Sequence, residues 1–235
     1  MNIELAGLII DIKNPGEYTI DMCKDYMYNG EKNPDIIIED DPQALEKERK
    51  LYPDATEDYL QNICIYRTIC KKIVDFDAML IHSAAISVDN KGYLFTALSG
   101  TGKTTHVNLW LKKFGERAVI INGDKPIVRN INGTFHVFGT PWCGKEGINT
   151  NTNVPIQAIC ILERGENNVI DRVNHQEAVT ELLRQTSRPA SVSGLTALLD
   201  ILDKVITKIP VYRLSCNMEP EAAEVAYNAI FGKNQ

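Results

Sequence analysis

The chain has 235 residues, and its content of 44% hydrophobic and 24% charged residues is typical of a globular protein. Its formal net charge of −6 is uneven, because residues 1–80 hold 17 acids and 9 bases while the remainder is slightly basic. The acidic front part disfavours nucleic acid and anionic membranes as partners. No apolar run approaches the roughly 18 residues of a membrane span.

The first residues lack the basic and apolar regions of a secretory signal, so we expect a cytoplasmic protein with reduced thiols. The six cysteines lack the Cys-x-x-Cys spacing of zinc sites and thioredoxin-type motifs, which argues against both. They are Cys23, Cys64, Cys70, Cys143, Cys160 and Cys216.

The first third of the chain mixes short strands with helices. We expect strands at 3–12 and 35–39, a loop with short elements at 14–34, and a helix at 42–50. Asp54 and Glu57 have the spacing of a capping box that opens a second helix. The second helix has an apolar stripe, which we interpret, with its two tyrosines, as facing the core. The stripe consists of Tyr59, Ile63, Tyr66, Cys70 and Ile73.

From residue 78 the pattern changes to alternating strands and helices. We expect strands at 79–88, 92–97, 118–122, 126–130, 134–138, 156–163, 168–173 and 210–214. Helices are expected from 103 to Gly115, at 177–186, at 195–206, and from Pro220 to just before Gly232. The chain therefore reads as one compact α/β unit, with an N-terminal α+β elaboration at 1–77 and a core at 78–235.

The most informative stretch is Leu98-Ser-Gly-Thr-Gly-Lys-Thr-Thr105, the back half of a phosphate-binding loop (P-loop, or Walker A motif) between an expected strand and helix. Small residues let backbone N–H groups face one anion, and the helix that follows adds its positive end. Lys103 is suited to the outer phosphates and the hydroxyl of Thr104 to Mg²⁺. The consensus has glycine where this chain has Ala97, so we expect a less contorted start of the loop. The expected nucleotide-binding residues are Ser99, Gly100, Thr101, Gly102, Lys103, Thr104 and Thr105.

Two residues near the loop are candidates for the chemistry. Asp124 follows a buried strand, where P-loop proteins place a second metal-binding acid, although Gly-Asp is also a common strand-ending turn. His82 lies on the strand pair before the loop. It either contacts the phosphoryl site or is a hydrogen-bonded core residue, and the sequence favours neither.

A further loop, Gly139-Thr-Pro-Trp-Cys-Gly-Lys145, has the composition of a binding loop. Lys145 is suited to a transferring phosphate, Thr140 to donating a hydrogen bond and Trp142 to stacking on a substrate. A structural turn with a solvated lysine explains the same residues, and Cys143 reads as a packing residue. Arg164, Arg172 and Arg188 each have the chemistry to clamp phosphate, but most arginines lie on surfaces. Lys125 reads as a solvated neighbour of Asp124, or as a further cation that reaches the phosphate.

The loop, together with the order His82, strand, loop and Ile121-Asn-Gly-Asp124, resembles the HPr serine kinase/phosphorylase group and the ATP-dependent phosphoenolpyruvate carboxykinases. The resemblance covers roughly residues 78–165. It implies a phosphoenolpyruvate-carboxykinase-like core with a mixed sheet, ATP and Mg²⁺ as cofactors, and phosphorylation of a hydroxyl. Lys103 would contact phosphates, Thr104 and Asp124 would hold the metal, and His82 would lie near the transferred group.

The chain departs from these families at Gly123, where the related kinases carry the first of two adjacent acids. The general base is therefore open among Asp124, His82 and an unidentified acid. We expect an ATP-dependent kinase, with Lys103, Asp124, His82 and Lys145 as its catalytic residues, acting on a hydroxyl of a small molecule, peptide or protein. A nucleotide-binding regulatory module with little transfer activity is the alternative, and a phosphatase or phosphorylase running the reverse reaction is a third. Homo-oligomer formation is left open.

Overall fold

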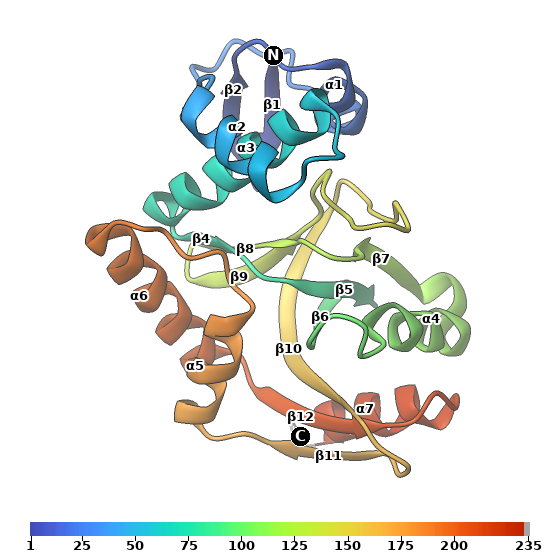
Figure 1. Ribbon diagram of the computed structural model, residues 1–235. Helices are drawn as coiled ribbons and strands as arrows, with labels where there is room; N and C mark the ends of the chain where they lie inside the picture. Colours follow the sequence, from blue (N-terminus) through green and yellow to red (C-terminus); the bar gives the residue numbers. More distant parts are fainter. Residues whose placement is uncertain (233–235) are drawn as a thin grey trace.

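The computed structural model describes residues 1–232, so the last three residues of the expected core lie outside the described range. A three-stranded sheet in the order β1-β2-β3 and the helices around it form the N-terminal end of the molecule (Figure 1). The strands are β1 (Asn2–Leu5), β2 (Leu8–Ile12) and β3 (Ile36–Ile38), and the helices are α1 (Glu17–Met22), α2 (Pro42–Leu51) and α3 (Glu57–Lys72), with short 3₁₀ turns at Lys24–Tyr26 and Ile73–Phe76.

Three details of this part differ from the sequence predictions. The expected strand at 3–12 is a hairpin, because Ala6 and Gly7 take positive φ values of 52° and 73°, as a tight two-residue turn requires. The expected capping box does not form, because Thr56 caps α3 and accepts a hydrogen bond from the amide of Tyr59. The stripe on α3 faces the core only in part. Cys70 and Ile73 are buried and Tyr66 packs against the same core cluster, as expected, whereas Tyr59 is 40% exposed.

A nine-stranded mixed sheet forms the rest of the fold, as expected. Its path runs β4-β8-β9-β10-β6-β5-β7, and β12 and β11 extend it from β10. The strands are β4 (Ala78–Leu80), β5 (Ser83–Val88), β6 (Lys91–Thr96), β7 (Ala118–Asn122), β8 (Ile127–Ile131), β9 (Thr134–Phe138), β10 (Asn153–Arg164), β11 (Val169–Arg172) and β12 (Val211–Cys216). β10 pairs in parallel with β6 and β12, while β5 pairs antiparallel with β6 and β7.

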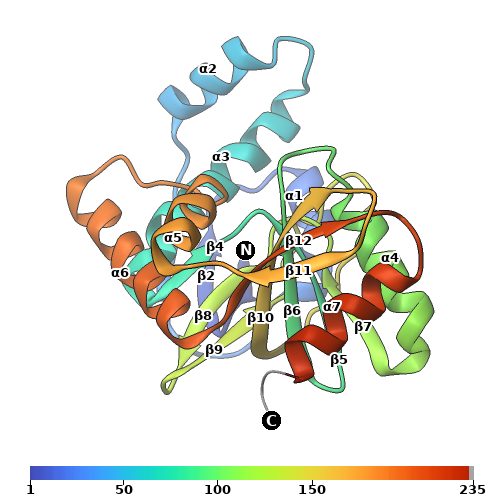
Figure 2. The same cartoon turned by 90° about the horizontal axis from the view of Figure 1, so that it is seen from below.

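Helices cover both faces of this sheet (Figures 1 and 2). They are α4 (Lys103–Phe114), α5 (His175–Arg184), α6 (Val192–Lys208) and α7 (Glu221–Gly232). α5 and α6 pack on one face and α4 and α7 on the other. Because strand side chains alternate, the unbroken apolar run in β10 serves both faces: Ala158 and Cys160 pack with α4 and α7, and Ile159 and Ile161 with α5 and α6.

The expected strand at 79–88 is two strands in different parts of the sheet. β4 pairs with β8 and β5 with β6 and β7. The ladder breaks where the amide of Ile81 donates to the carbonyl of Pro126 and the amide of His82 to the carbonyl of Gln185. The chain therefore turns a corner at His82, directly before β5.

The pairing registers bring three chain segments to one edge of the sheet. Ser83 at the start of β5 lies opposite Thr96 at the end of β6, and Ala85 lies opposite Asn122 at the end of β7. The residues before β5 and those after β6 and β7 therefore meet at this edge. No helix within residues 1–232 is long and apolar enough to cross a bilayer.

Candidate active site

The P-loop leaves the end of β6 and leads into α4. Gly100 and Gly102 have φ values of +80° and +122°, which only glycine adopts readily, so both positions need glycine for their backbone. Ala97 is buried and is not among the residues with positive φ, which agrees with the expected gentler start of the loop. Lys103, at the first turn of α4, is 9% exposed, and its Nζ donates to the carbonyl of Ala97 at 3.3 Å. Burial lowers the pKa of Lys103, and the charge of Asp124 opposes that shift.

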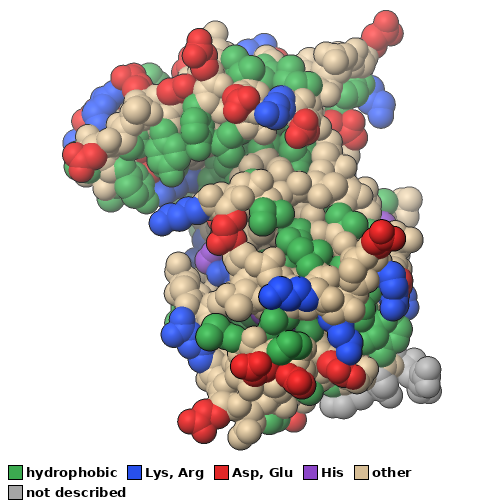
Figure 3. Space-filling model, turned by 90° about the vertical axis from the view of Figure 1, so that its right-hand side faces the viewer, with side chains coloured by type: hydrophobic (Ala, Val, Ile, Leu, Met, Phe, Trp, Pro, Cys, Tyr) green, Lys and Arg blue, Asp and Glu red, His purple; other side chains and the backbone are tan. Residues whose placement is uncertain are grey.

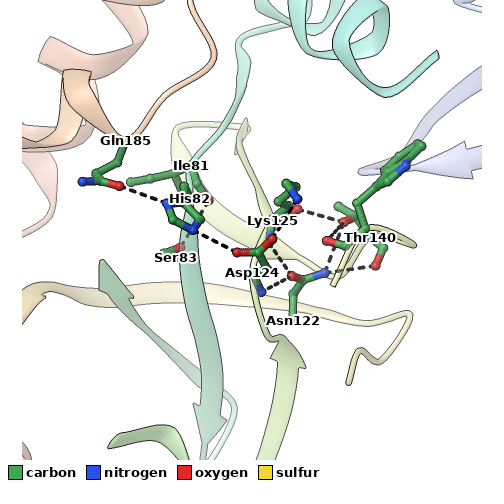
Figure 4. Close-up of polar contacts among 9 residues, drawn as sticks. Ile81, His82, Ser83, Asn122, Asp124, Lys125, Thr140 and Gln185 are labelled. Atoms are coloured by element: carbon green, nitrogen blue, oxygen red, sulfur yellow. Dashed lines mark hydrogen bonds and ion pairs between the residues drawn. The ribbon is translucent and has the colours of Figure 1, made fainter. Parts of the chain in front are cut away.

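Asp124 lies in a charged cluster beside the loop (Figure 4). His82 Nε2 is 2.9 Å from Asp124 Oδ1, and Lys125 Nζ is 2.8 Å from Asp124 Oδ2. Burial favours the neutral acid, but the hydrogen bonds from His82 and Lys125 outweigh it and hold the pKa of Asp124 well below its ordinary value. Asp124 is therefore ionised at neutral pH, and Lys125, expected to be solvated, contacts it directly.

The fully buried Asn122 side chain shapes the turn that carries Asp124. Its Oδ1 accepts from the amides of Asp124 at 2.9 Å and Lys125 at 2.6 Å, and its Nδ2 donates to the carbonyl and hydroxyl of Thr140. The Thr140 hydroxyl donates to the carbonyl of Lys125 at 2.8 Å. Thr140 is 0% exposed, and the hydrogen bond that its hydroxyl donates joins two loops of the protein. An asparagine that ends a buried strand is a signal for such a turn.

His82 is held from both sides. Its Nδ1 lies 3.1 Å from Gln185 Oε1, while its Nε2 contacts Asp124. His82 is thus neither a plain core residue nor a free group, since it links the acid to a loop that follows α5. Gln185 was not identified from the sequence, because 103 positions separate it from His82.

Gly123 is tightly packed. A Cβ at this position would lie 3.0 Å from the carbonyl oxygen of Cys143, closer than most Cβ contacts, and 3.4 Å from that of Ile148. A second acid would therefore fit only if the loop after β9 shifted by a few tenths of an ångström.

These groups share a cleft of about 1040 Å³ that lies between the P-loop and the N-terminal helices. The loop, His82, Asp124, Lys125 and Lys145 line one side of it. Two of the described lining residues are acidic, Asp124 and Glu146. Glu146, on an exposed loop, is thus an acid of the site that sequence reasoning missed. Figure 3 shows the hollow, with Lys or Arg and His side chains visible in it beneath the overhanging N-terminal part.

The remaining candidates have different positions. Trp142 lines the cleft but is only 6% exposed, and its Nε1 donates to Asn62 Oδ1 at 3.2 Å, so it mainly joins the loop to α3. Arg164 donates to the carbonyls of Gly100 at 2.5 Å and Thr101 at 3.3 Å, and so holds the P-loop from outside the cleft. Arg172 and Arg188 are exposed and do not line the cleft.

The site has the donors that a nucleotide with Mg²⁺ requires. The hydroxyl of Thr104 and the carboxylate of Asp124 are hard oxygen ligands on the same cleft. No group of three or more His, Cys, Asp or Glu side chains within residues 1–232 is arranged to hold a metal by itself. Mg²⁺ usually takes one or two protein ligands together with phosphate oxygens, so this sparse donor set fits it.

No protein-family model matches the chain, and no curated protein matches it significantly. Among solved structures, the chain is similar to the HPr(Ser) kinase/phosphatase from Coxiella burnetii, at 10% sequence identity and a TM-score of 0.41. The similarity covers 66% of this chain and 99% of that chain. A likeness this low assigns neither an activity nor a substrate, so both depend on the residues of the cleft.

Proposed function

We propose that the chain is an ATP-dependent phosphotransferase that moves a γ-phosphoryl group to a hydroxyl held in the cleft. The observation that carries the proposal is that the P-loop, the buried Lys103 and the ionised Asp124 face one cleft with room for a nucleotide and an acceptor. Ligand pockets are typically about 300–1000 Å³, so this cleft is large for a single ligand.

Each group of residues in the cleft has a separate role in such a transfer. Backbone amides of the loop and the start of α4 cradle the phosphates, and Lys103 holds the outer ones. Thr104 and Asp124 would hold Mg²⁺, which would supply positive charge to the phosphates. The acceptor oxygen bonds to the γ-phosphorus as the bond to the β–γ bridging oxygen breaks, and ADP leaves. Because the transition state is loose, a weak base suffices for the hydroxyl proton, and the carboxylates that the described residues bring to the cleft are those of Asp124 and Glu146.

Lys103→Ala tests this function. The variant should lose roughly 10²-fold or more in transfer of labelled γ-phosphate to a pool of hydroxyl acceptors, because a buried cation at the developing charge is removed. The matched control is Lys113→Ala, an exposed lysine of α4 that pairs with Glu224 away from the cleft. Transfer by Lys103→Ala at the wild-type rate would exclude the proposal.

The second candidate is a nucleotide-binding regulatory module, favoured by the tightly packed glycine at position 123 in place of an acid. Tight binding of Mg-ATP without turnover across the acceptor pool would support it, and ATP consumption stimulated by one acceptor would exclude it. Dephosphorylation that depends on inorganic phosphate would instead indicate the reverse reaction.

A further inference from the structure

The wall of the cleft opposite the P-loop is apolar and aromatic. We call it the roof, and define it as Tyr18 and Met22 of α1, Tyr52 after α2, and Tyr59 and Ile63 of α3. Tyr18, Tyr52 and Tyr59 are 42%, 45% and 40% exposed, and the rings of Tyr18 and Tyr59 meet edge to face at 5.5 Å. In Figure 3, hydrophobic side chains gather on the overhanging N-terminal part above the hollow.

The residues proposed to bind phosphate and Mg²⁺ are not part of the roof. The loop, Lys103 and Asp124 all lie on the opposite side of the cleft. The N-terminal helices add one basic residue to the cleft lining, Arg67, and it is paired with Glu48 at 2.5 Å. Exposed clusters of tyrosine and methionine are the composition of recognition surfaces, since aromatic rings supply large contact area with few rotatable bonds.

Charge differs between the two sides of the cleft. Near roof residues in the chain, Glu17, Asp21 and Asp54 are exposed, with Asp21 paired to Lys24 at 3.6 Å, and residues 1–80 as a whole carry an excess of acids. The opposite side holds Lys103, Lys125 and Lys145, which suit phosphate. A ligand that reaches from the roof to the phosphate site therefore meets apolar rings flanked by negative charge.

We propose that the roof binds the acceptor, and that the acceptor is a polypeptide segment with an apolar, preferably aromatic, side chain beside its hydroxyl residue and basic residues farther out. The inference rests on the proposed function, because it names the substrate class of the same cleft. Pockets for small molecules bury most of the ligand surface. The roof instead leaves three rings nearly half exposed on an overhang, which suits a chain that lies along it. The basic flanks complement Glu17, Asp54 and the excess of acids in residues 1–80.

Direct binding tests this without relying on turnover. The probe is a fluorescein-labelled nine-residue peptide with a central serine, a phenylalanine on each side of it and two lysines at each end. Two matched peptides replace the phenylalanines with glycine or the lysines with aspartate. Anisotropy is measured with the full chain, Mg²⁺ and a non-hydrolysable ATP analogue, for wild type, Tyr18→Ala/Tyr59→Ala, and the control Ile20→Ala. Ile20 lies on α1, is 46% exposed and does not line the cleft.

We expect the first peptide to bind wild type and Ile20→Ala at least tenfold more tightly than either matched peptide, and the double variant to lose this preference. The double variant should retain wild-type affinity for a fluorescent ATP analogue, which shows that its fold is intact. Equal binding of the three peptides, binding of none of them, or an unchanged preference in the double variant would overturn the inference. Selective peptide binding without phosphoryl transfer would contradict the proposed function while leaving the roof assignment intact.

Discussion

Gly123 bears on whether the site is an active phosphotransferase or a nucleotide-binding regulatory module. It is the position at which the kinases that this chain resembles carry an acid. Two backbone carbonyls would lie within 3.4 Å of any Cβ there. We predict that Gly123→Asp lowers γ-phosphate transfer rather than raising it, because the new side chain must displace the loop beside Asp124. Gly123→Ala should show most of the same loss and a lower midpoint in urea unfolding. A Gly123→Asp protein that turns over faster than wild type would show that the loop gives way and that the missing acid limits the rate.

The ion pairs of Asp124 predict how the stability of the fold depends on pH. Its folded-state pKa is depressed, so the unfolded chain binds the proton more readily, and the stability that the ionised carboxylate contributes is present above its ordinary pKa of 3.8. This contribution is lost as the pH falls from about 4 toward the folded-state pKa. Urea unfolding should therefore show wild type losing its advantage over Asp124→Asn below about pH 4 and keeping it unchanged between pH 5 and 7. A constant difference down to pH 2 would mean that His82 and Lys125 do not stabilise the charge.

At the scale of elements, the P-loop depends on its neighbour β10 as well as on its own sequence. Arg164 ends β10 and donates to two carbonyls of the loop, Gly100 and Thr101. We predict that Arg164→Ala weakens binding of a fluorescent ATP analogue about fivefold, since a net hydrogen bond contributes about 1 kcal/mol and the arginine is exposed. Arg172→Ala, on β11, which β12 separates from β10 in the sheet, is the matched control and should bind as wild type does. If both variants bind alike, the loop holds its shape without β10.

At the scale of the whole molecule, the N-terminal part is tied to the core by the loops after β9 and by β8. Trp142 donates to Asn62, Asn149 to the hydroxyl of Tyr26, and Arg129 to the carbonyl of Ala6 at 2.6 Å. Of these contacts, the one between Trp142 and Asn62 joins two residues that both line the cleft. The division at residue 77 stays a prediction, although the larger sheet begins at Ala78.

Asn62→Ala tests this coupling. Asn62 is 4% exposed, and its Oδ1 accepts from both Trp142 and Thr19, so alanine leaves two buried donors without a partner. We predict a loss of roughly 1–3 kcal/mol in the free energy of unfolding, measured in urea. Asn151→Ala, which removes an exposed hydrogen bond between the same two parts, should change stability by less than about 0.5 kcal/mol. Equal effects would indicate that Asn62 is not the tighter link.

The features that could be predicted from the chain alone are those that depend on neighbouring residues. The spacing of glycine, lysine and threonine in the P-loop predicts strand, loop and helix, because the backbone angles and the helix start are local properties. An apolar run ended by Asn-Gly-Asp likewise placed Asp124 after a buried strand. The mixed sheet came from the resemblance, and the structure confirms it.

Which segments meet became visible only in the folded arrangement. An apolar stripe on α3 shows that a helix has two faces, but not that Tyr59 lines a cleft while Leu60 and Ile69 are buried. The partners of His82 are Asp124 and Gln185, which lie far from it in the chain, and Glu146 lines the cleft one residue beyond the loop singled out from the sequence. The physical reason is that sheet register and the packing of the N-terminal helices bring these groups together, and neither is a property of any local stretch of sequence.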